Sequence, residues 1–156
     1  MEDRLSRFEG KIMKRPFEST DLLTEEGAPA VLEAIEFLKN QEAVNALIWD
    51  NSLQSSSQDH VLDNGPKGRF SHKGSDGSTP WDRMARYVIL KGFSGENIDY
   101  GLKDSLSVIL NLIIDDGVKD RGHRQNIFNP NYKSVGIYTG YHTIFEQMTV
   151  MDYNGF

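Results

Sequence analysis

The 156-residue sequence contains no cysteine. This absence excludes disulfide bonds, thiol nucleophiles and cysteine-ligated zinc or iron–sulfur sites, and it leaves the cellular compartment open because secreted proteins can also lack disulfides. A chain of this length can bury a continuous core without such cross-links. We therefore expect one domain that is held together by packing alone.

Long apolar runs are also missing. No stretch approaches the roughly 18 apolar residues that a membrane-spanning helix needs. The first residues, MEDRLSRFEGK, mix charges of both signs instead of placing a basic tip before an apolar run. We therefore expect neither a transmembrane segment nor a signal peptide in this chain.

Positive charge is scarce relative to negative charge, with 17 Lys and Arg against 23 Asp and Glu and a formal net charge of −6. This balance opposes binding to nucleic acid or to an anionic membrane surface. The remaining composition, 38% hydrophobic and 26% charged, is typical of a globular protein. Small molecules or proteins are the expected partners.

Apolar residues at helical spacing predict four helices. The last of them is apolar on nearly all sides, which is typical of a buried helix. Residues 1–27 show only weak periodicity and are expected to be a lead-in segment that lies on a single domain formed by residues 28–156. The predicted helices cover residues 29–40, 47–65, 80–87 and 102–114.

Strand patterns are concentrated near the C-terminus. Residues 134–153, SVGIYTGYHTIFEQMTVMDY, alternate apolar and polar positions on both sides of GYHT, which predicts an antiparallel hairpin with GYHT as its loop. In GFSGENIDYG, only a short extended piece around Ile98 and Tyr100 is expected. The fold class is therefore α+β, with helices covering an antiparallel sheet.

Four histidines could take part in chemistry. His60 lies on a predicted helix and His142 in the predicted hairpin loop, where a packed or solvated role is the simpler explanation. His72 and His123 lie in glycine-bearing loops beside acids, and such loops often carry function. Two neutral imidazoles can bind a divalent metal such as zinc, while nearby carboxylates complete the site or orient the imidazoles.

Three carboxylates could join these histidines: Glu96 in SGENI, and Asp115 or Asp116 at the end of the predicted buried helix. An acid at a helix C-terminus opposes the helix dipole by about 0.3–1 kcal/mol. A cation should compensate, and Arg121, Arg124 or a metal ion would serve.

A plainer explanation stays open for the same residues. Asp115 and Asp116 could simply end the helix, Glu96 could make a loop hydrogen bond, and the arginines could pair with surface acids. The spacing matches no compact metal motif such as H-E-x-x-H. Residue spacing alone does not decide between the two.

Three stretches together resemble the CAP superfamily of cysteine-rich secretory, antigen-five and pathogenesis-related proteins, in its cysteine-free microbial branch. They are FSHKGSDGSTPWDRM, SGENI and DDGVKDRGHRQNIFNPNYKSVGI, and the resemblance covers roughly residues 28–153. It implies a three-layer α-β-α sandwich with a central antiparallel sheet. It also implies a cleft built from two histidines and two acids, here His72, Glu96 and His123, with Asp115 as the first choice for the second acid and Asp116 as the next.

The chain departs from the family pattern near the second acid. Many relatives have tryptophan followed three residues later by glutamate, whereas this sequence has Leu112 and Asp115. The histidine-tyrosine-threonine-glutamine run of plant and animal members is also absent. The shorter aspartate puts its direct contact with a shared ligand in doubt, and activities of the elaborated members are not transferred.

The resemblance implies a secreted, non-catalytic binding module. The expected cofactor is a divalent metal, with zinc as first choice, on His72 and His123, and folding should not require it. A small-molecule or lipid-like ligand is the expected partner. Two alternatives are a metal-dependent hydrolase or protease with Glu96 or Asp115 as general base, and an extracellular domain that binds a cell-surface protein.

Overall fold

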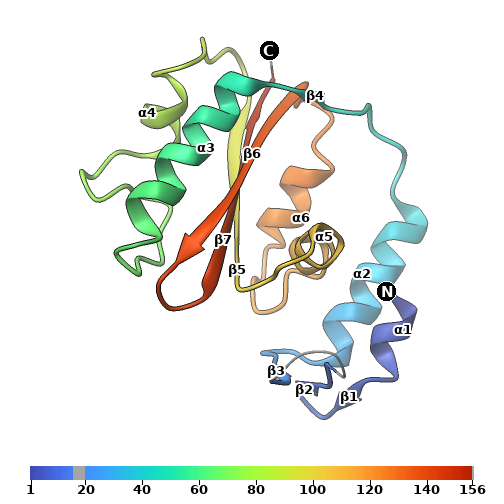
Figure 1. Cartoon of the computed structure of the whole chain (residues 1–156). Coiled ribbons are helices and arrows are strands. Elements are labelled where there is room, and N and C mark those ends of the chain that lie inside the picture. Colours follow the sequence, from blue (N-terminus) through green and yellow to red (C-terminus); the bar gives the residue numbers. More distant parts are fainter. Residues whose placement is uncertain (16–19, 156) are drawn as a thin grey trace.

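The computed structural model describes residues 1–15 and 20–155. Its main sheet has the strand order β4-β6-β7-β5, and helices cover both faces. Figure 1 shows α3 and α4 on one face and α2, α5 and α6 on the other. The helices are α2 (Ala28–Asn40), α3 (Asn51–Asn64), α4 (Pro80–Met84), α5 (Ser105–Ile114) and α6 (Gly122–Ile127), and the strands are β4 (Ile48–Trp49), β5 (Ser94–Tyr100), β6 (Ser134–His142) and β7 (Glu146–Asn154).

This arrangement confirms the α+β class with helices on both sides of a sheet. The sheet is not wholly antiparallel, because the two-residue strand β4 pairs with β6 in parallel. The residues Ile48 and Trp49 were expected to begin a helix. The α3 helix begins after them because the Asp50 side chain caps it, accepting hydrogen bonds from the amides of Ser52 and Leu53.

The predicted C-terminal hairpin is present as β6 and β7, but its turn lies later than GYHT. Pairing continues to His142 opposite Glu146. The His142 Nδ1 atom accepts hydrogen bonds from the amides of Ile144 and Phe145, both at 3.2 Å. The imidazole thus satisfies turn amides that have no strand partner, which moves the turn to residues 143–145.

The β5 strand is longer than the predicted short piece, because seven residues pair with β7. Its alternation of apolar and polar side chains is weak, since Glu96, Asn97 and Asp99 are all buried polar residues. These buried polar side chains break the apolar–polar alternation, so hydrophobic periodicity does not predict the full length of the strand.

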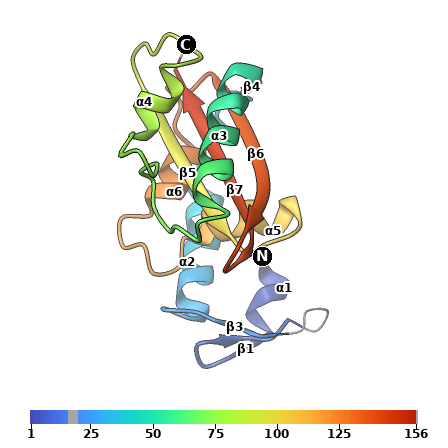
Figure 2. The same cartoon turned by 60° about the vertical axis from the view of Figure 1, so that its left-hand side comes forward.

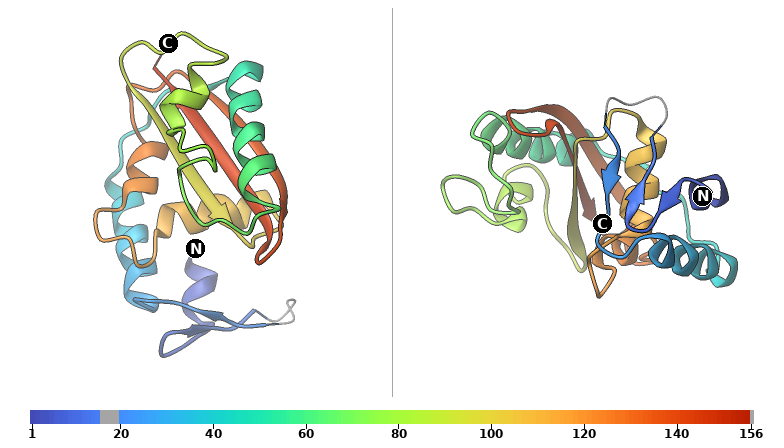
Figure 3. Two further views of the ribbon diagram at one scale, coloured as in Figure 1. Left: turned by 90° about the vertical axis from the view of Figure 1, so that its left-hand side faces the viewer. Right: turned by 90° about the horizontal axis from the view of Figure 1, so that it is seen from below.

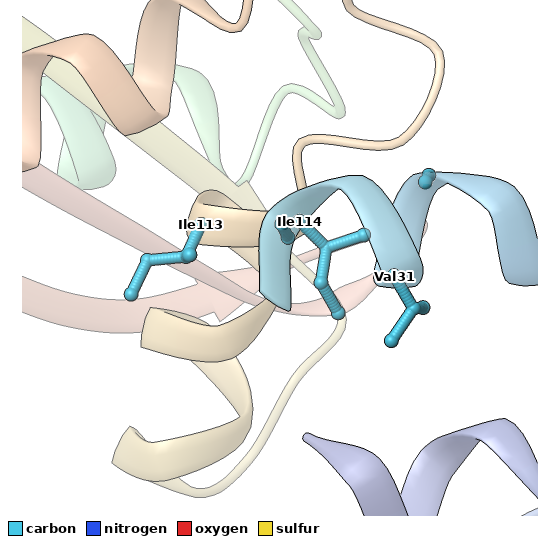
Figure 4. Close-up of a cluster of buried hydrophobic side chains, with 5 residues drawn as sticks. Val31, Ile113 and Ile114 are labelled. Atoms are coloured by element: carbon cyan, nitrogen blue, oxygen red, sulfur yellow. The ribbon is translucent and has the colours of Figure 1, made fainter. Parts of the chain in front are cut away.

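The core lies in separate layers. Val61, Ile98, Met148 and Val150 pack between α3 and the sheet. On the other face, the cluster comprises Val108, Leu112, Tyr132, Met151 and Tyr153. A further cluster joins α2 to α5, and Figure 4 shows its members Val31, Ile113 and Ile114.

The predicted fully buried helix is buried on one side only. On α5, the Leu106 side chain points into solvent and is 66% exposed. The α4 helix is shorter than predicted and ends at Met84. In the described part of the chain, no helix is both long and apolar enough to cross a membrane.

The N-terminal segment contains structure that its weak periodicity did not predict. It forms α1 (Glu2–Leu5) and a small antiparallel sheet of β1 (Phe8–Glu9), β2 (Ile12–Met13) and β3 (Leu22–Leu23). Figures 2 and 3 show this sheet apart from the main sheet, at the end of the molecule where α1 lies. Side chains of this segment pack against the cluster between α2 and α5.

Candidate functional site

The first half of the candidate site is a histidine–carboxylate pair on the α3 side of the sheet. His72 lies in the loop after α3 and Glu96 on β5, and the Nδ1 atom of His72 lies 2.7 Å from Oε1 of Glu96. Arg83 of α4 pairs with the other Glu96 oxygen and also donates to the His72 carbonyl at 2.9 Å. Both Glu96 oxygens are thus engaged, and its side chain is 1% exposed.

Arg83 was not predicted from the sequence. It is almost fully buried, and it joins the loop that carries His72 to the strand that carries Glu96. Burying an arginine is costly unless its charge is paired. Its pairing with Glu96 meets that requirement and fixes the position of the carboxylate.

The second pair forms at the junction of α5 and α6. Asp115 ends α5 in a left-handed conformation with φ 57°, and its Oδ1 atom lies 2.7 Å from Nδ1 of His123. The other oxygen accepts a hydrogen bond from the His123 backbone amide at 2.9 Å. Asp115 therefore orients the His123 imidazole and also satisfies an amide in the first turn of α6.

The two pairs share one pattern. In each, Nδ1 of the imidazole contacts a buried carboxylate, and among the described residues no hydrogen bond involves Nε2 of either histidine. A carboxylate behind an imidazole fixes its tautomer and the orientation of its ring. Both histidines are accordingly prepared to use Nε2, whether as a hydrogen-bonding group, a base or a metal ligand.

A chain of amide side chains links the pairs across β5. Asn97 donates from Nδ2 to the His123 carbonyl at 2.9 Å. Asn126 of α6 donates to Oδ1 of Asn97 at 2.8 Å and accepts from the Tyr132 hydroxyl at 3.1 Å. Sequence reasoning did not select these residues, although Asn97 follows Glu96 in SGENI and could have been chosen on that ground.

A pocket of about 400 Å³ opens beside the first pair. Its wall is mostly apolar, and it includes Trp81, whose side chain is half exposed. His72 lines this pocket, whereas His123 is not among its lining residues. The lining residues are His72, Lys73, Thr79, Pro80, Trp81, Ser94, Gly95, Glu96, Asn126 and Tyr132.

Asp116 lies apart from both pairs. Its two oxygens accept hydrogen bonds from the backbone amides of Glu25 and Glu26, at 2.6 and 2.9 Å. The two adjacent aspartates therefore contact different parts of the molecule: Asp115 contacts His123, whereas Asp116 holds the N-terminal segment against the end of α5.

The arginines do not compensate these acids as predicted. Arg121 donates to the Asp115 backbone carbonyl at 2.7 Å and pairs with Glu26 at 2.6 Å. Arg124 donates to the Ile114 carbonyl at 3.1 Å and pairs with Glu33. Positive charge at a helix C-terminus is stabilising. The arginines thus offset the helix dipole by binding the carbonyls, and not the carboxylates, at the end of α5.

The two remaining histidines are packed inside the protein. On α3, His60 contacts the Ser71 carbonyl through Nε2 at 2.9 Å, and burial lowers its pKa. His142 is also fully buried and lies next to the Arg69 carbonyl. His142 was predicted to lie in the hairpin loop, whereas it is the last residue of β6 and its ring fills the base of the turn.

Two buried acids have no signal in the sequence. Burial, followed by the nearby charge of Glu96, raises the pKa of Asp152 on β7 to about 8. Burial also raises the pKa of Asp99 on β5 to about 6, although the hydrogen bond that Asn111 donates to Asp99 acts in the opposite direction and lowers this pKa. Neither residue carries a motif, and only their positions in the folded sheet distinguish them.

The donor set of the site is too small for a typical zinc ion. No group of three or more histidine, aspartate and glutamate side chains within the described ranges could hold a metal ion. Zinc sites generally have three or four protein ligands, so a zinc ion on His72 and His123 would have fewer protein ligands than is usual. The expected zinc ion on His72 and His123 stays a prediction.

Comparison with known proteins places the chain in a family. The model of the cysteine-rich secretory protein family, CAP, matches residues 32–153. The chain belongs to the CAP family. One relative is the uncharacterized protein YkwD of Bacillus subtilis, which is 28% identical over 107 residues. That match covers 69% of this chain and 40% of YkwD, so the chain spans about two fifths of that relative.

Two solved structures share the fold. An extracellular SCP-domain protein from Bacillus anthracis superposes with a TM-score of 0.59 at 21% identity, over 77% of this chain and 36% of that chain. An outer surface protein from Borrelia burgdorferi gives a TM-score of 0.59 at 16% identity, over 81% of this chain and 86% of that chain. At these identities the likeness concerns the fold alone.

Proposed function

We propose that this CAP domain is a binding module that holds a small, partly apolar molecule in the pocket beside His72. The observation that carries the proposal is the pairing of His72 with Glu96 at the wall of a mostly apolar pocket of about 400 Å³. Ligand pockets commonly measure about 300–1,000 Å³ and combine an apolar lining with a few oriented polar groups.

The lining suggests an amphiphilic ligand with an acidic or hydrogen-bond-accepting end. Lys73 offers a cationic donor on one side, where the imidazole of His72 adds a polar ring, while Pro80, Trp81 and Tyr132 offer flat apolar surface. A medium-length fatty acid has both features and serves as the probe.

A hydrolase with Glu96 or Asp115 as direct base is less favoured. Each of the four carboxylate oxygens is engaged, those of Glu96 by His72 and Arg83 and those of Asp115 by the ring and amide of His123. A general base must reach the proton that it removes. The role that these contacts support for both carboxylates is to orient an imidazole.

Secretion is part of the proposal. Its support is that one structural relative is named an extracellular protein and another an outer surface protein. Expression of the full-length natural gene, followed by detection of this domain in the culture medium and in the cell fraction, tests it. Retention in the cells would contradict it.

The two tryptophans provide a matched test of the pocket. Trp81 lines the pocket and is 52% exposed, whereas Trp49 lies on β4 and is 51% exposed. The Trp49→Phe variant keeps only the pocket tryptophan, and the Trp81→Phe variant keeps only the control. Each is titrated with 11-bromoundecanoic acid, whose bromine quenches tryptophan fluorescence at contact.

We expect saturable quenching in Trp49→Phe and only weak, linear quenching in Trp81→Phe, because random collisions should affect two equally exposed rings equally. Adding His72→Ala to Trp49→Phe should weaken binding roughly tenfold if a hydrogen bond between the ligand and the imidazole is lost. Equal, non-saturating quenching of both tryptophans would contradict the proposed pocket.

A further inference from the structure

A buried cluster of polar side chains, called the chamber below, lies between α3 and the main sheet, behind Glu96. Four α3 residues with fully buried side chains, Ser56, Ser57, His60 and Asn64, face it, and Asp152 of β7 is also fully buried. Buried polar atoms normally have hydrogen-bond partners. In the described part of the chain, the polar atoms of this region without one include His60 Nδ1, Asn64 Oδ1 and Arg83 Nε. The Asp152 carboxyl makes no hydrogen bond of ordinary geometry there, and its nearest polar neighbours on α3 are the Ser56 and Ser57 hydroxyls, whose interaction lowers its pKa.

Asp152 stands directly beside Glu96. The two residues are register partners on the neighbouring antiparallel strands β7 and β5. Opposite residues on such strands point to the same face, with Cβ atoms about 4.5–5.5 Å apart. The carboxyl of Asp152 is therefore adjacent to the carboxylate that orients His72.

The charges of the chamber do not balance if both carboxyls are ionised. Arg83 is the only arginine or lysine paired there in the described structure, and it binds Glu96 and the carbonyls of His72 and Ser78. On α3, His60 has a lowered pKa and supplies no charge. An ionised, unpaired carboxylate in such a place costs far more than a neutral carboxylic acid.

We propose that Asp152 is a positioning residue for the pocket: a neutral carboxylic acid that holds Glu96, and through it His72, in the orientation that binds ligand. The inference rests on the proposed function for its binding readout. A neutral carboxyl can donate as well as accept a hydrogen bond, so it suits a chamber that contains orphaned acceptors on His60 and Asn64. Burial raises the pKa of Asp152 in the direction that keeps it neutral.

Infrared spectroscopy tests the neutral state without any ligand. At pH 6.5, the wild-type protein should show the carbonyl band of a protonated carboxylic acid that is absent from Asp152→Asn. The Asp99→Asn variant serves as the control and should retain that band. A wild-type spectrum without an Asp152-dependent band would overturn the proposal.

The positioning role is tested by nitrogen-15 NMR of the His72 ring in the metal-free protein. In Asp152→Leu, which keeps volume but removes hydrogen bonding, we expect His72 to lose the Nδ1–H tautomer signature, whereas Asp152→Asn should restore it. Asp99→Leu, which removes a buried acid from β5 that bonds to Asn111 of α5, should leave the signature unchanged. An unaltered His72 signature in folded Asp152→Leu would overturn the positioning role.

Binding is then measured by bromoundecanoic acid quenching in the Trp49→Phe background. We expect Asp152→Leu to weaken binding at least fivefold and Asp152→Asn to recover most of the loss. Equal affinity in folded Asp152→Leu would refute a contribution to binding. If the parent variant does not bind the probe, the proposed pocket fails, while the infrared and NMR results still decide whether Asp152 is neutral and orients His72.

Discussion

Asp152 should make the stability of this protein fall as the pH rises. The groups that face it are Glu96 from β5, Arg83 from α4 and His60 from α3, and Arg83 is already paired with Glu96. Burial raises the pKa of Asp152 from its ordinary value of 3.8 to about 8. The perturbation is Asp152→Asn, which keeps the shape of the side chain but cannot ionise.

The sign follows from proton binding. Because the folded-state pKa is raised, the stability that Asp152 contributes is complete below pH 3.8 and is lost as the pH rises toward 8. Between these limits the folded protein holds one proton more than the unfolded chain, which lowers the free energy of unfolding by about 1.4 kcal/mol per pH unit. From pH 5 to pH 7 the loss is about 3 kcal/mol.

Urea unfolding of both proteins at pH 5, 6, 6.5, 7 and 7.5 measures this slope. Groups common to both proteins cancel in the difference, so the stability of Asp152→Asn relative to wild type should rise by about 3 kcal/mol from pH 5 to 7. Asp99→Asn is the control: with a folded-state pKa of about 6, its difference should be nearly constant between pH 6.5 and 7.5. A pH-independent difference for Asp152→Asn would refute the reasoning.

Three further outcomes follow from the contacts around the site. Arg83→Met should lower the free energy of unfolding, measured in urea, by about 3–5 kcal/mol, because it leaves the buried charge of Glu96 without a partner. Adding Glu96→Gln should recover most of this loss. A cost of less than about 1 kcal/mol for Arg83→Met alone would contradict the reasoning. Asp116→Ala should cost up to about 1.5 kcal/mol and speed amide exchange in residues 20–27, and unchanged exchange there would refute the anchoring role. Zinc affinity measured by calorimetry should fall in His72→Ala and His123→Ala and should weaken as the pH drops through about 6.5, where imidazoles gain protons; equal affinity in all three proteins would exclude these ligands.

Hydrophobic periodicity predicted the elements that have one apolar face. The α2 helix and the β6–β7 hairpin follow their patterns closely, because burial on one side leaves the spacing of apolar residues visible. Periodicity failed at β5, where buried Glu96, Asn97 and Asp99 stand at positions that apolar residues would otherwise occupy. It failed again in residues 1–27, where strands of two residues are too short to show alternation.

The candidate site was predicted only in part, and for a related reason. His72, Glu96 and His123 lie in recognisable stretches, and the structure gives each histidine a carboxylate partner. The family resemblance ranked Asp115 before Asp116, and the physical reason for their different contacts is the left-handed end of α5, which turns the two neighbouring side chains in different directions. No residue spacing along the chain encodes that backbone conformation in advance.

The residues that hold the site together have a weaker sequence signal than the residues they hold. Arg83 and Asp152 are recognisable only through what surrounds them in the folded chain, since both are polar residues in elements whose other residues look ordinary. Their burial is costly unless Glu96 lies between them, carrying the charge that pairs with Arg83 and leaves Asp152 neutral. Removing the Glu96 charge should therefore change the protonation of Asp152 and the orientation of His72 together. We expect Glu96→Gln to affect every polar group of the chamber, and not only the contact between Glu96 and His72.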